Sequence, residues 1–182
     1  MVCMENKKKH RLHNRKGFTL AETLLAVLIL LMVSQIVATG IPVAKNAYEK
    51  VVLTSNAEVL LSTAVTMLRN ELGTAREIKV SDTQTEVTYF NADRANMAKI
   101  GLEDGSVKIH RYYPVDGIGL DSGAEPLVTK DRATADLYVT FKDVSYDSKN
   151  KVVTFTKVSV CRESGTRDLA VRDTLSINVM AN

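Results

Sequence analysis

Cysteine and histidine are scarce in this chain of 182 residues, and each scarcity removes a class of site. There are two cysteines, and Cys3 lies in a basic N-terminal segment that we argue below is removed, so no disulfide is available within the remainder. We expect Cys161 to lie in a strand as a small apolar residue, with an intermolecular disulfide as the alternative. Of the three histidines only His110 lies beyond the N-terminal segment, and its setting, Lys108-Ile109-His110-Arg111, predicts an exposed strand position.

The usual patterns of catalytic, metal and cofactor sites are also missing from the sequence. A Ser-His-Asp or Cys-His site would have to use His110. No Cys and His cluster has the spacing of zinc ligands, and no glycine-rich loop has a phosphate-binding form. Asp116, Asp121 and Glu125 could bind calcium, but their spacing lacks an EF-hand pattern, and solvated loop residues are the favoured interpretation. We therefore expect no enzymatic activity, no cofactor and no bound metal.

Positive charge is concentrated at the N-terminus. Residues 1–17 contain six Lys and Arg and one acid, Glu5, whereas the remaining residues carry 18 Lys and Arg against 20 Asp and Glu. The formal charge of +3 therefore comes from the first segment, and nothing in the rest indicates nucleic-acid binding. No apolar stretch with a small-residue cleavage site precedes Gly17, so the segment is not a conventional secretory signal.

A long apolar run follows the basic segment. The polar residues among the 21 from Phe18 to Ala38 are Thr19, Glu22, Thr23, Ser34 and Gln35. As a helix this run would be about 31 Å long, close to the roughly 30 Å hydrocarbon core of a bilayer, which predicts a single membrane span. Basic residues directly before a first span keep that side cytoplasmic, so we expect the remainder outside the cytoplasmic membrane. An ionised carboxylate in such a span costs about 3 kcal/mol, so Glu22 should have a cationic partner.

The order of residues at the start of this run resembles the type IV pilin and type II secretion pseudopilin family, with its prepilin-type cleavage and methylation motif. The matching residues are Lys16-Gly17-Phe18-Thr19-Leu20, Glu22 and Leu24-Leu25-Ala26-Val27-Leu28-Ile29, and the match extends to about Ile36. The resemblance implies that a prepilin peptidase cuts after Gly17 and methylates the new N-terminal residue, Phe18. It also implies other pilin or pseudopilin subunits as partners and, indirectly, an assembly ATPase and a platform protein.

Gly17 and Glu22 also have direct physical explanations. A missing side chain at Gly17 lets a protease approach the scissile bond, whereas the alternative is a linker glycine. Cleavage would place a new amine at Phe18, and Glu22 lies one helical turn away, where its carboxylate could neutralise the amine of its own or the next subunit. The alternative for Glu22 is a tolerated polar residue near the cytoplasmic interface. The family resemblance implies that Glu22 supports both subunit docking and N-methylation.

Beyond the apolar run, Gly40 and Pro42 predict a kink or a short melted segment in the helix. This segment would mark either the membrane exit or a point where the helix loosens when subunits pack into a filament. Helical spacing then continues from Val43 to about Arg76. The apolar stripe that we expect a sheet to cover contains Leu53, Ala57, Leu60 or Leu61, Ala64, Leu68 and Leu72.

From Ile78 the apolar period changes to two, which is typical of strands. The predicted strands are 78–80, 87–90, 98–102, 107–113, 137–146, 152–161 and 169–179. Asp104-Gly105 predicts a hairpin turn, and residues 114–132 predict a long surface loop. Arg111-Tyr112-Tyr113 could stack on a ligand, although a strand edge next to Pro114 is favoured. We therefore expect an α+β fold, with a long N-terminal helix whose second half packs on an antiparallel sheet.

These patterns predict three parts: a removed leader at 1–17, a membrane and filament-core helix at 18–42, and an extracytoplasmic head at 43–182. The head would contain an amphipathic helix at 43–76 and a sheet at 78–180. The expected function is a structural, minor pilin or pseudopilin of a type IV pilus, type II secretion or competence filament, placed at the cell surface or in the periplasm or cell wall. The competing hypothesis is a membrane-tethered module that binds a ligand and joins no filament.

Overall fold

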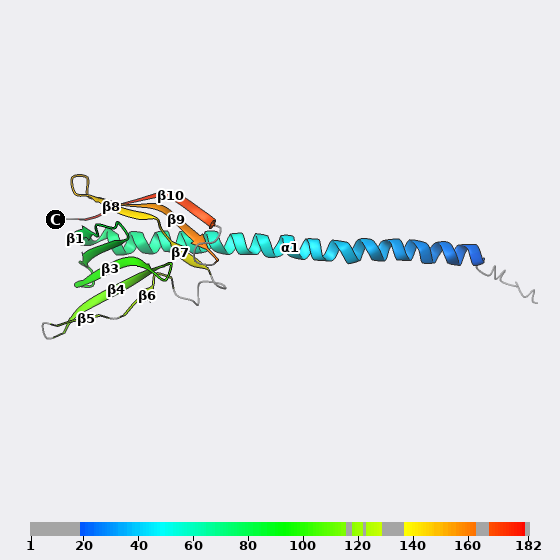
Figure 1. Cartoon of the computed structure of the whole chain (residues 1–182), viewed down its shortest axis with the longest axis horizontal. Helices are drawn as coiled ribbons and strands as arrows, with labels where there is room; N and C mark the ends of the chain where they lie inside the picture. The colour runs from blue at the N-terminus through cyan, green and yellow to red at the C-terminus, as the bar shows by residue number, and fades with distance from the viewer. Residues whose placement is uncertain (1–18, 116–117, 122, 129–136, 163–167, 181–182) are drawn as a thin grey trace, which may run out of the picture. The chain divides into compact units, whose positions relative to one another are not determined.

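The computed structural model describes residues 19–115, 118–121, 123–128, 137–162 and 168–180, with the side chains of 114–120 excluded. The chain forms two compact units, residues 1–47 and 48–182. Helix α1, Leu20–Gly73, begins in the first unit and ends in the second (Figure 1).

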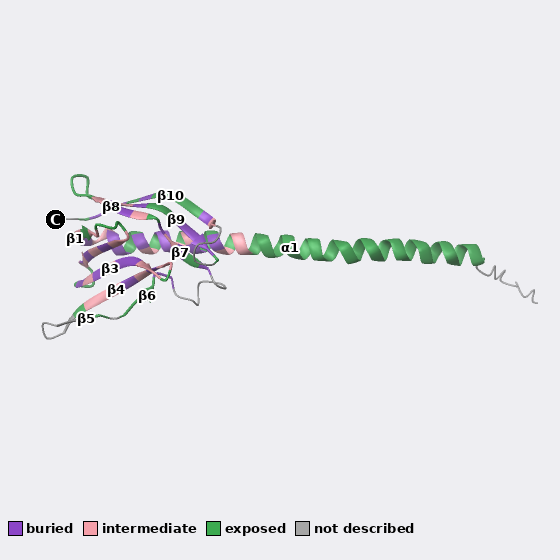
Figure 2. Ribbon diagram, viewed as in Figure 1, coloured by how far each residue is buried: buried purple, intermediate pink, exposed green. Residues whose placement is uncertain are grey.

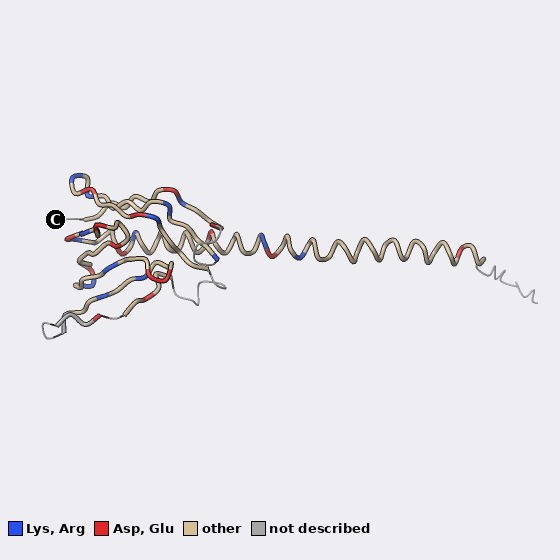
Figure 3. The backbone as a smooth tube through the Cα atoms, viewed as in Figure 1, with Lys and Arg blue, Asp and Glu red and all other residues tan. Residues whose placement is uncertain are grey.

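The first unit contains the apolar part of α1. Its large apolar side chains are exposed, and this part of the helix is green throughout Figure 2. Between Glu22 and Lys45 the helix carries no charged residue, as the tan stretch of Figure 3 shows. By length and composition α1 is apolar enough to cross a membrane once.

Gly40 and Pro42 both lie inside α1, which continues through them as helix. The short melted segment expected there is therefore absent from the single chain. Since Pro42 lacks an N–H, one helical hydrogen bond is missing at this point. Loosening of the helix on filament packing stays a prediction.

The second unit contains two antiparallel sheets. The first has the order β1-β2-β3-β4-β5, with β6 also pairing with β4. Its strands are β1 (Ala75–Val80), β2 (Glu86–Asn91), β3 (Asn96–Glu103), β4 (Ser106–Val115), β5 (Ile118–Asp121) and β6 (Glu125–Pro126). The second has the order β10-β9-β7, with β8 also pairing with β9. Its strands are β7 (Tyr138–Thr140), β8 (Asp143–Asp147), β9 (Val152–Cys161) and β10 (Asp168–Asn178).

The core of the second unit joins the helix to both sheets. The predicted stripe on α1 is confirmed, since Ala57, Leu60, Ala64, Leu68 and Leu72 are buried and Leu53 is partly buried against the same core. One continuous apolar cluster contains these residues and buried side chains of both sheets, shown in purple in Figure 2. Burying one such leucine stabilises the fold by about 1.5–3 kcal/mol. The α+β fold, with a long N-terminal helix packed on antiparallel sheets, is confirmed.

Local turn chemistry explains how β3 connects to β4. Asp104 and Gly105 form the predicted hairpin turn, with φ values of 52° and 73°. Two consecutive positive φ values are what a type I′ turn requires, and glycine adopts them at no steric cost.

The helix ends at Gly73 and not at Arg76, and the Met180 N–H donates to the Gly73 carbonyl at 3.1 Å. This bond satisfies one of the carbonyls left free at the helix end.

Three sequence predictions for the sheets are wrong. The segment predicted as a loop from 114 to 132 contains the end of β4 together with β5 and β6. Pro114 is tolerated there because β3 pairs with β4 only as far as Tyr112, so the missing N–H removes no bond on that side. The single strand predicted at 137–146 is two strands, β7 and β8, and both pair with β9. The head thus has two sheets, where one was predicted.

Candidate functional site

The start of α1 is built from a reciprocal pair of hydrogen bonds between Thr19 and Glu22. The Thr19 N–H donates to Glu22 Oε2 at 2.8 Å, and the Thr19 hydroxyl donates to the same oxygen at 3.0 Å. In return the Glu22 N–H donates to Thr19 Oγ1 at 3.3 Å. This arrangement is a capping box, which satisfies the free N–H groups of a first helical turn. The carboxylate also lies at the positive end of the helix dipole, which favours its charge.

The sequence itself contains a signal for this box. Thr19-Leu20-Ala21-Glu22 has the Thr-x-x-Glu spacing of a capping box directly before an apolar run. Gly17 and Phe18 lie outside the described residues. Thr19 directly follows Phe18 in the chain, and the Glu22 carboxylate that it caps lies four residues beyond Phe18, the position at which cleavage would create an amine.

A second polar cluster lies deep in the head, around Glu71 of α1, which is 8% exposed. Tyr89 and Asn91 donate to Glu71 Oε2 at 3.3 Å and 3.1 Å. Arg94 and Arg111 each approach Glu71 Oε1 at 2.9 Å. Burial raises the pKa of Tyr89 and the Glu71 carboxylate adds to the rise, so the phenol stays protonated and donates. The cluster fastens the helix to β2, β4 and the turn before β3.

Arg111 connects this cluster to the edge of the first sheet, because it also pairs with Glu125 of β6. The Arg111 side chain is 14% exposed and bridges two carboxylates. Stacking of Arg111 on a ligand, one of the two sequence interpretations, would compete with these pairs. The interpretation as part of a strand agrees with its place in β4.

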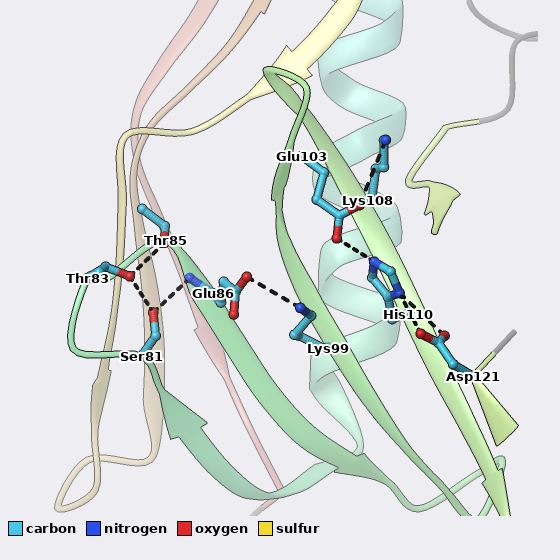
Figure 4. A network of polar contacts seen from close by, with 9 residues as sticks. All are labelled: Ser81, Thr83, Thr85, Glu86, Lys99, Glu103, Lys108, His110 and Asp121. Atoms are coloured by element: carbon cyan, nitrogen blue, oxygen red, sulfur yellow. Dashed lines mark hydrogen bonds and ion pairs between the residues drawn. The ribbon is translucent and has the colours of Figure 1, made fainter. Parts of the chain in front are cut away.

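His110 lies on the other face of β4, and the prediction that it is exposed is wrong. Its side chain is 13% exposed, with Nε2 2.5 Å from Glu103 Oε1 and Nδ1 3.2 Å from Asp121 Oδ2 (Figure 4). Strand alternation indicated the face correctly, but it could not show that pairing with β3 and β5 would bring a carboxylate to each side of the ring. Among the described residues, neither serine nor cysteine makes a hydrogen bond to the imidazole.

The acids considered as calcium ligands have other contacts where the structure describes them. Asp121 contacts His110 and accepts a hydrogen bond from the Gly123 N–H at 2.9 Å, whereas Glu125 contacts Arg111. Asp116 lies outside the described residues. Within the described part of the chain, no group of three or more His, Cys, Asp and Glu side chains is placed to hold a metal ion.

Cys161 ends β9 as a buried residue, which confirms its predicted place in a strand. Its thiol donates to Asp168 Oδ1 at 3.3 Å, and Lys157 Nζ lies 2.9 Å from Asp168 Oδ2. Burial raises the pKa of the Cys161 thiol. The hydrogen bond from Lys157, followed by that from Cys161, holds the pKa of Asp168 below its usual range.

The lowered pKa of Asp168 predicts a pH-dependent contribution to stability. We expect Asp168→Asn to lower the free energy of unfolding by about 1 kcal/mol at pH 7, because it weakens one ion pair and one hydrogen bond at a partly exposed site. A carboxylate whose folded pKa is depressed stabilises the fold above its unfolded pKa of about 3.9, and this contribution is lost as pH falls through the folded value. Urea unfolding in detergent at pH 7 and pH 3 measures it. An equal loss of unfolding free energy at pH 7 and pH 3 would contradict the lowered pKa of Asp168. Asp82→Asn, at an exposed turn, is the control.

Among the described residues, the three predicted site residues Glu22, Gly40 and Pro42 do not come together. Glu22 is capped by Thr19, and Gly40 and Pro42 lie farther along the same helix. No family model, curated protein or solved structure matched the chain, so its function is inferred from the residues at the start of α1 and from the fold.

Proposed function

We propose that this chain is a structural subunit of the pilin or pseudopilin type. In this proposal a prepilin peptidase processes it, and its N-terminal helix assembles into a type IV pilus, type II secretion or competence filament. The observation that carries the proposal is the sequence block from Lys16 to Glu22, which runs into the start of a helix that is apolar enough to cross a membrane. The α+β head, in which the end of the same helix is buried against two sheets, supports it.

We infer a role for Glu22 in this process, and the geometry at the helix start is consistent with it. Thr19 holds the carboxylate over the first turn, so its charge is already stabilised within the precursor. Cleavage after Gly17 creates an amine at Phe18, next to Thr19 in the chain. The carboxylate then has a cation to pair with, in its own subunit or in a neighbour. The attraction is strongest where water is excluded, as in a filament core.

Because the apolar part of the helix would span the membrane, insertion of the precursor comes before assembly in this proposal. The helix anchors the precursor in the cytoplasmic membrane, with the basic leader inside and the head outside. Moving about twenty apolar residues out of lipid is very unfavourable, so the helix has to be buried again against neighbouring helices. An assembly ATPase, acting through a platform protein, would drive that transfer.

Processing at Gly17 is the direct test. When the chain is expressed with a prepilin peptidase, we expect a mature protein that begins at Phe18 and carries one added methyl group, as measured by intact mass and N-terminal sequencing. Gly17→Ile should block the cut, because the added side chain obstructs the protease. Gly40→Ala is the control, since an added Cβ there meets no atom within 4 Å.

A membrane-bound chain that still begins at Met1 beside an active peptidase would refute the proposal. The competing hypothesis, a tethered ligand-binding module, predicts that result. A chain that is processed but never recovered in sheared filaments would also favour the tethered module.

A further inference from the structure

The imidazole of His110 lies between two carboxylates that belong to different strands. Glu103 of β3 faces Nε2 at 2.5 Å, and Asp121 at the end of β5 faces Nδ1 with both of its oxygens, at 3.2 and 3.3 Å. Figure 4 shows the two carboxylates on opposite sides of the ring. Because the His110 side chain is largely buried, water has little access to the ring in place of these partners.

This arrangement suits one protonation state of the ring. An ionised carboxylate can only accept hydrogen bonds, so each ring nitrogen has to carry a proton. Imidazolium has two N–H donors, whereas neutral imidazole has one N–H and one lone pair. Loss of a ring proton therefore leaves a lone pair facing a carboxylate at one of the two contacts. Histidine ordinarily changes its charge between about pH 5 and 8, a range in which Asp and Glu carboxyls are ordinarily ionised.

Two lysines share this face of the first sheet with the histidine. Lys99, directly opposite it on β3, pairs with Glu86 of β2 at 3.3 Å (Figure 4). Lys108 lies two residues before it on β4, with Nζ 2.7 Å from Asp104 Oδ2 and 3.8 Å from Glu103 Oε2. Lys108 therefore helps to keep the Glu103 carboxylate beside the ring whatever the charge of the ring.

Asp121 has no such second cation among the described residues. Besides the ring, its carboxylate accepts a hydrogen bond from the Gly123 N–H at 2.9 Å. Tyr112 pairs with Asp121 along the backbone, and a phenol ordinarily carries no charge in this pH range. The Asp121 contact is the longer of the two, and the Asp121 side chain is 44% exposed against 32% for Glu103. When the ring loses a proton, the contact with Asp121 should therefore be the one that breaks.

We propose that the charge of His110 controls how firmly β5 is attached to the first sheet. The imidazolium links β4 to Asp121, and loss of the Nδ1 proton as pH rises releases that carboxylate to water. In the described part of the chain β5 pairs with β4 alone, at an edge of the sheet, so one side-chain link is a large share of what holds its end. In the proposed function the head lies outside the cytoplasmic membrane, where pH follows the medium, but the link itself does not require that function.

Nitrogen-15 NMR of the histidine ring, in the full chain in detergent, tests the protonation states. The starting variant carries His10→Gln and His13→Gln, so that His110 supplies the only imidazole. We expect both ring nitrogens to be protonated at pH 5.5, and Nδ1 alone to have lost its proton at pH 8.5.

Hydrogen exchange of the β5 amides, on the same samples, tests the attachment of the strand. After correction for the ordinary dependence of exchange on pH, protection should fall about two- to fivefold between pH 5.5 and pH 8.5, the effect of losing one partly exposed ion pair. Strand β8 of the second sheet is the control and should keep its protection. Asp121→Ala should show the lower protection at both pH values.

Glu103→Gln separates the ring proton from the packing of the ring. A glutamine amide can donate to Nε2 as well as accept from it, so a neutral ring can keep its proton on Nδ1 and stay bonded to Asp121. Protection of β5 should then be the same at pH 5.5 and pH 8.5. A pH-dependent loss that persists in Glu103→Gln, loss of the Nε2 proton before the Nδ1 proton, or unchanged β5 protection in the starting variant would each overturn the proposal. Processing at Phe18 is measured separately, so the link can fail while the proposed function stands.

Discussion

Glu71→Leu is expected to lower the free energy of unfolding of the head by about 3–5 kcal/mol. Glu71 is 8% exposed and accepts hydrogen bonds from Tyr89 and Asn91, while Arg94 and Arg111 both approach the same carboxylate. Removing the carboxylate leaves a phenol, an amide and two guanidinium groups without their shared partner. Breaking one side of a buried ion pair costs far more than the pair contributes, because the remaining charge stays desolvated.

Urea unfolding of the full chain in detergent, followed by circular dichroism of the head, measures this effect. Glu58→Leu is the matched control, because Glu58 is an exposed acid on the same helix, and its replacement should change stability by at most about 0.5 kcal/mol. Adding Arg111→Met to Glu71→Leu should recover part of the loss, because Arg111 is largely buried and without Glu71 is left with the partly exposed Glu125 as its carboxylate partner. If Glu71→Leu and Glu58→Leu unfolded at the same urea concentration, the cluster around Glu71 would contribute nothing to stability.

The comparison of Glu71 with its neighbours shows what the sequence could predict. Leu68 and Leu72 follow from helical period alone, since burial of an apolar stripe depends on local spacing. Glu71 lies beside Leu72 on the buried side, but its partners are 18 to 40 residues away in the sequence. They reach Glu71 only through the register of β2, β3 and β4. A long-range contact of this kind leaves no periodic signal.

The sheet errors have the same origin. The short strands β5 and β6 lie in a segment rich in Gly, Asp and Ser, and they form by backbone pairing with β4, which depends little on side-chain type. His110 was placed on the correct strand, yet its environment depends on the strands to either side. By contrast, the Thr19 to Glu22 box is local, and its spacing is readable from the sequence alone.

Glu22→Val is expected to leave the chain in the membrane fraction and cut after Gly17, yet almost absent from sheared filaments. Valine is more favourable than a carboxylate in lipid, so insertion is not impaired. In the proposed filament the same change would leave the amine of Phe18 without its proposed anion in a site that excludes water. Loss of one partner of such a pair is worth about 3–5 kcal/mol, so incorporation should fall at least a hundredfold, as measured by quantitative immunoblotting of sheared and cellular fractions.

Two further variants separate the charge of Glu22 from its role as a helix cap. Glu22→Gln keeps an oxygen that can accept the Thr19 hydrogen bonds but loses the charge, so it should retain the helix start and still fail to assemble. Thr19→Val removes the hydroxyl but leaves the Thr19 N–H, which approaches Glu22 Oε2 at 2.8 Å. Because loss of a capping side chain costs about 1 kcal/mol, incorporation of Thr19→Val should fall only about fivefold. Normal incorporation of Glu22→Gln would assign Glu22 to capping alone and refute pairing with the new amine.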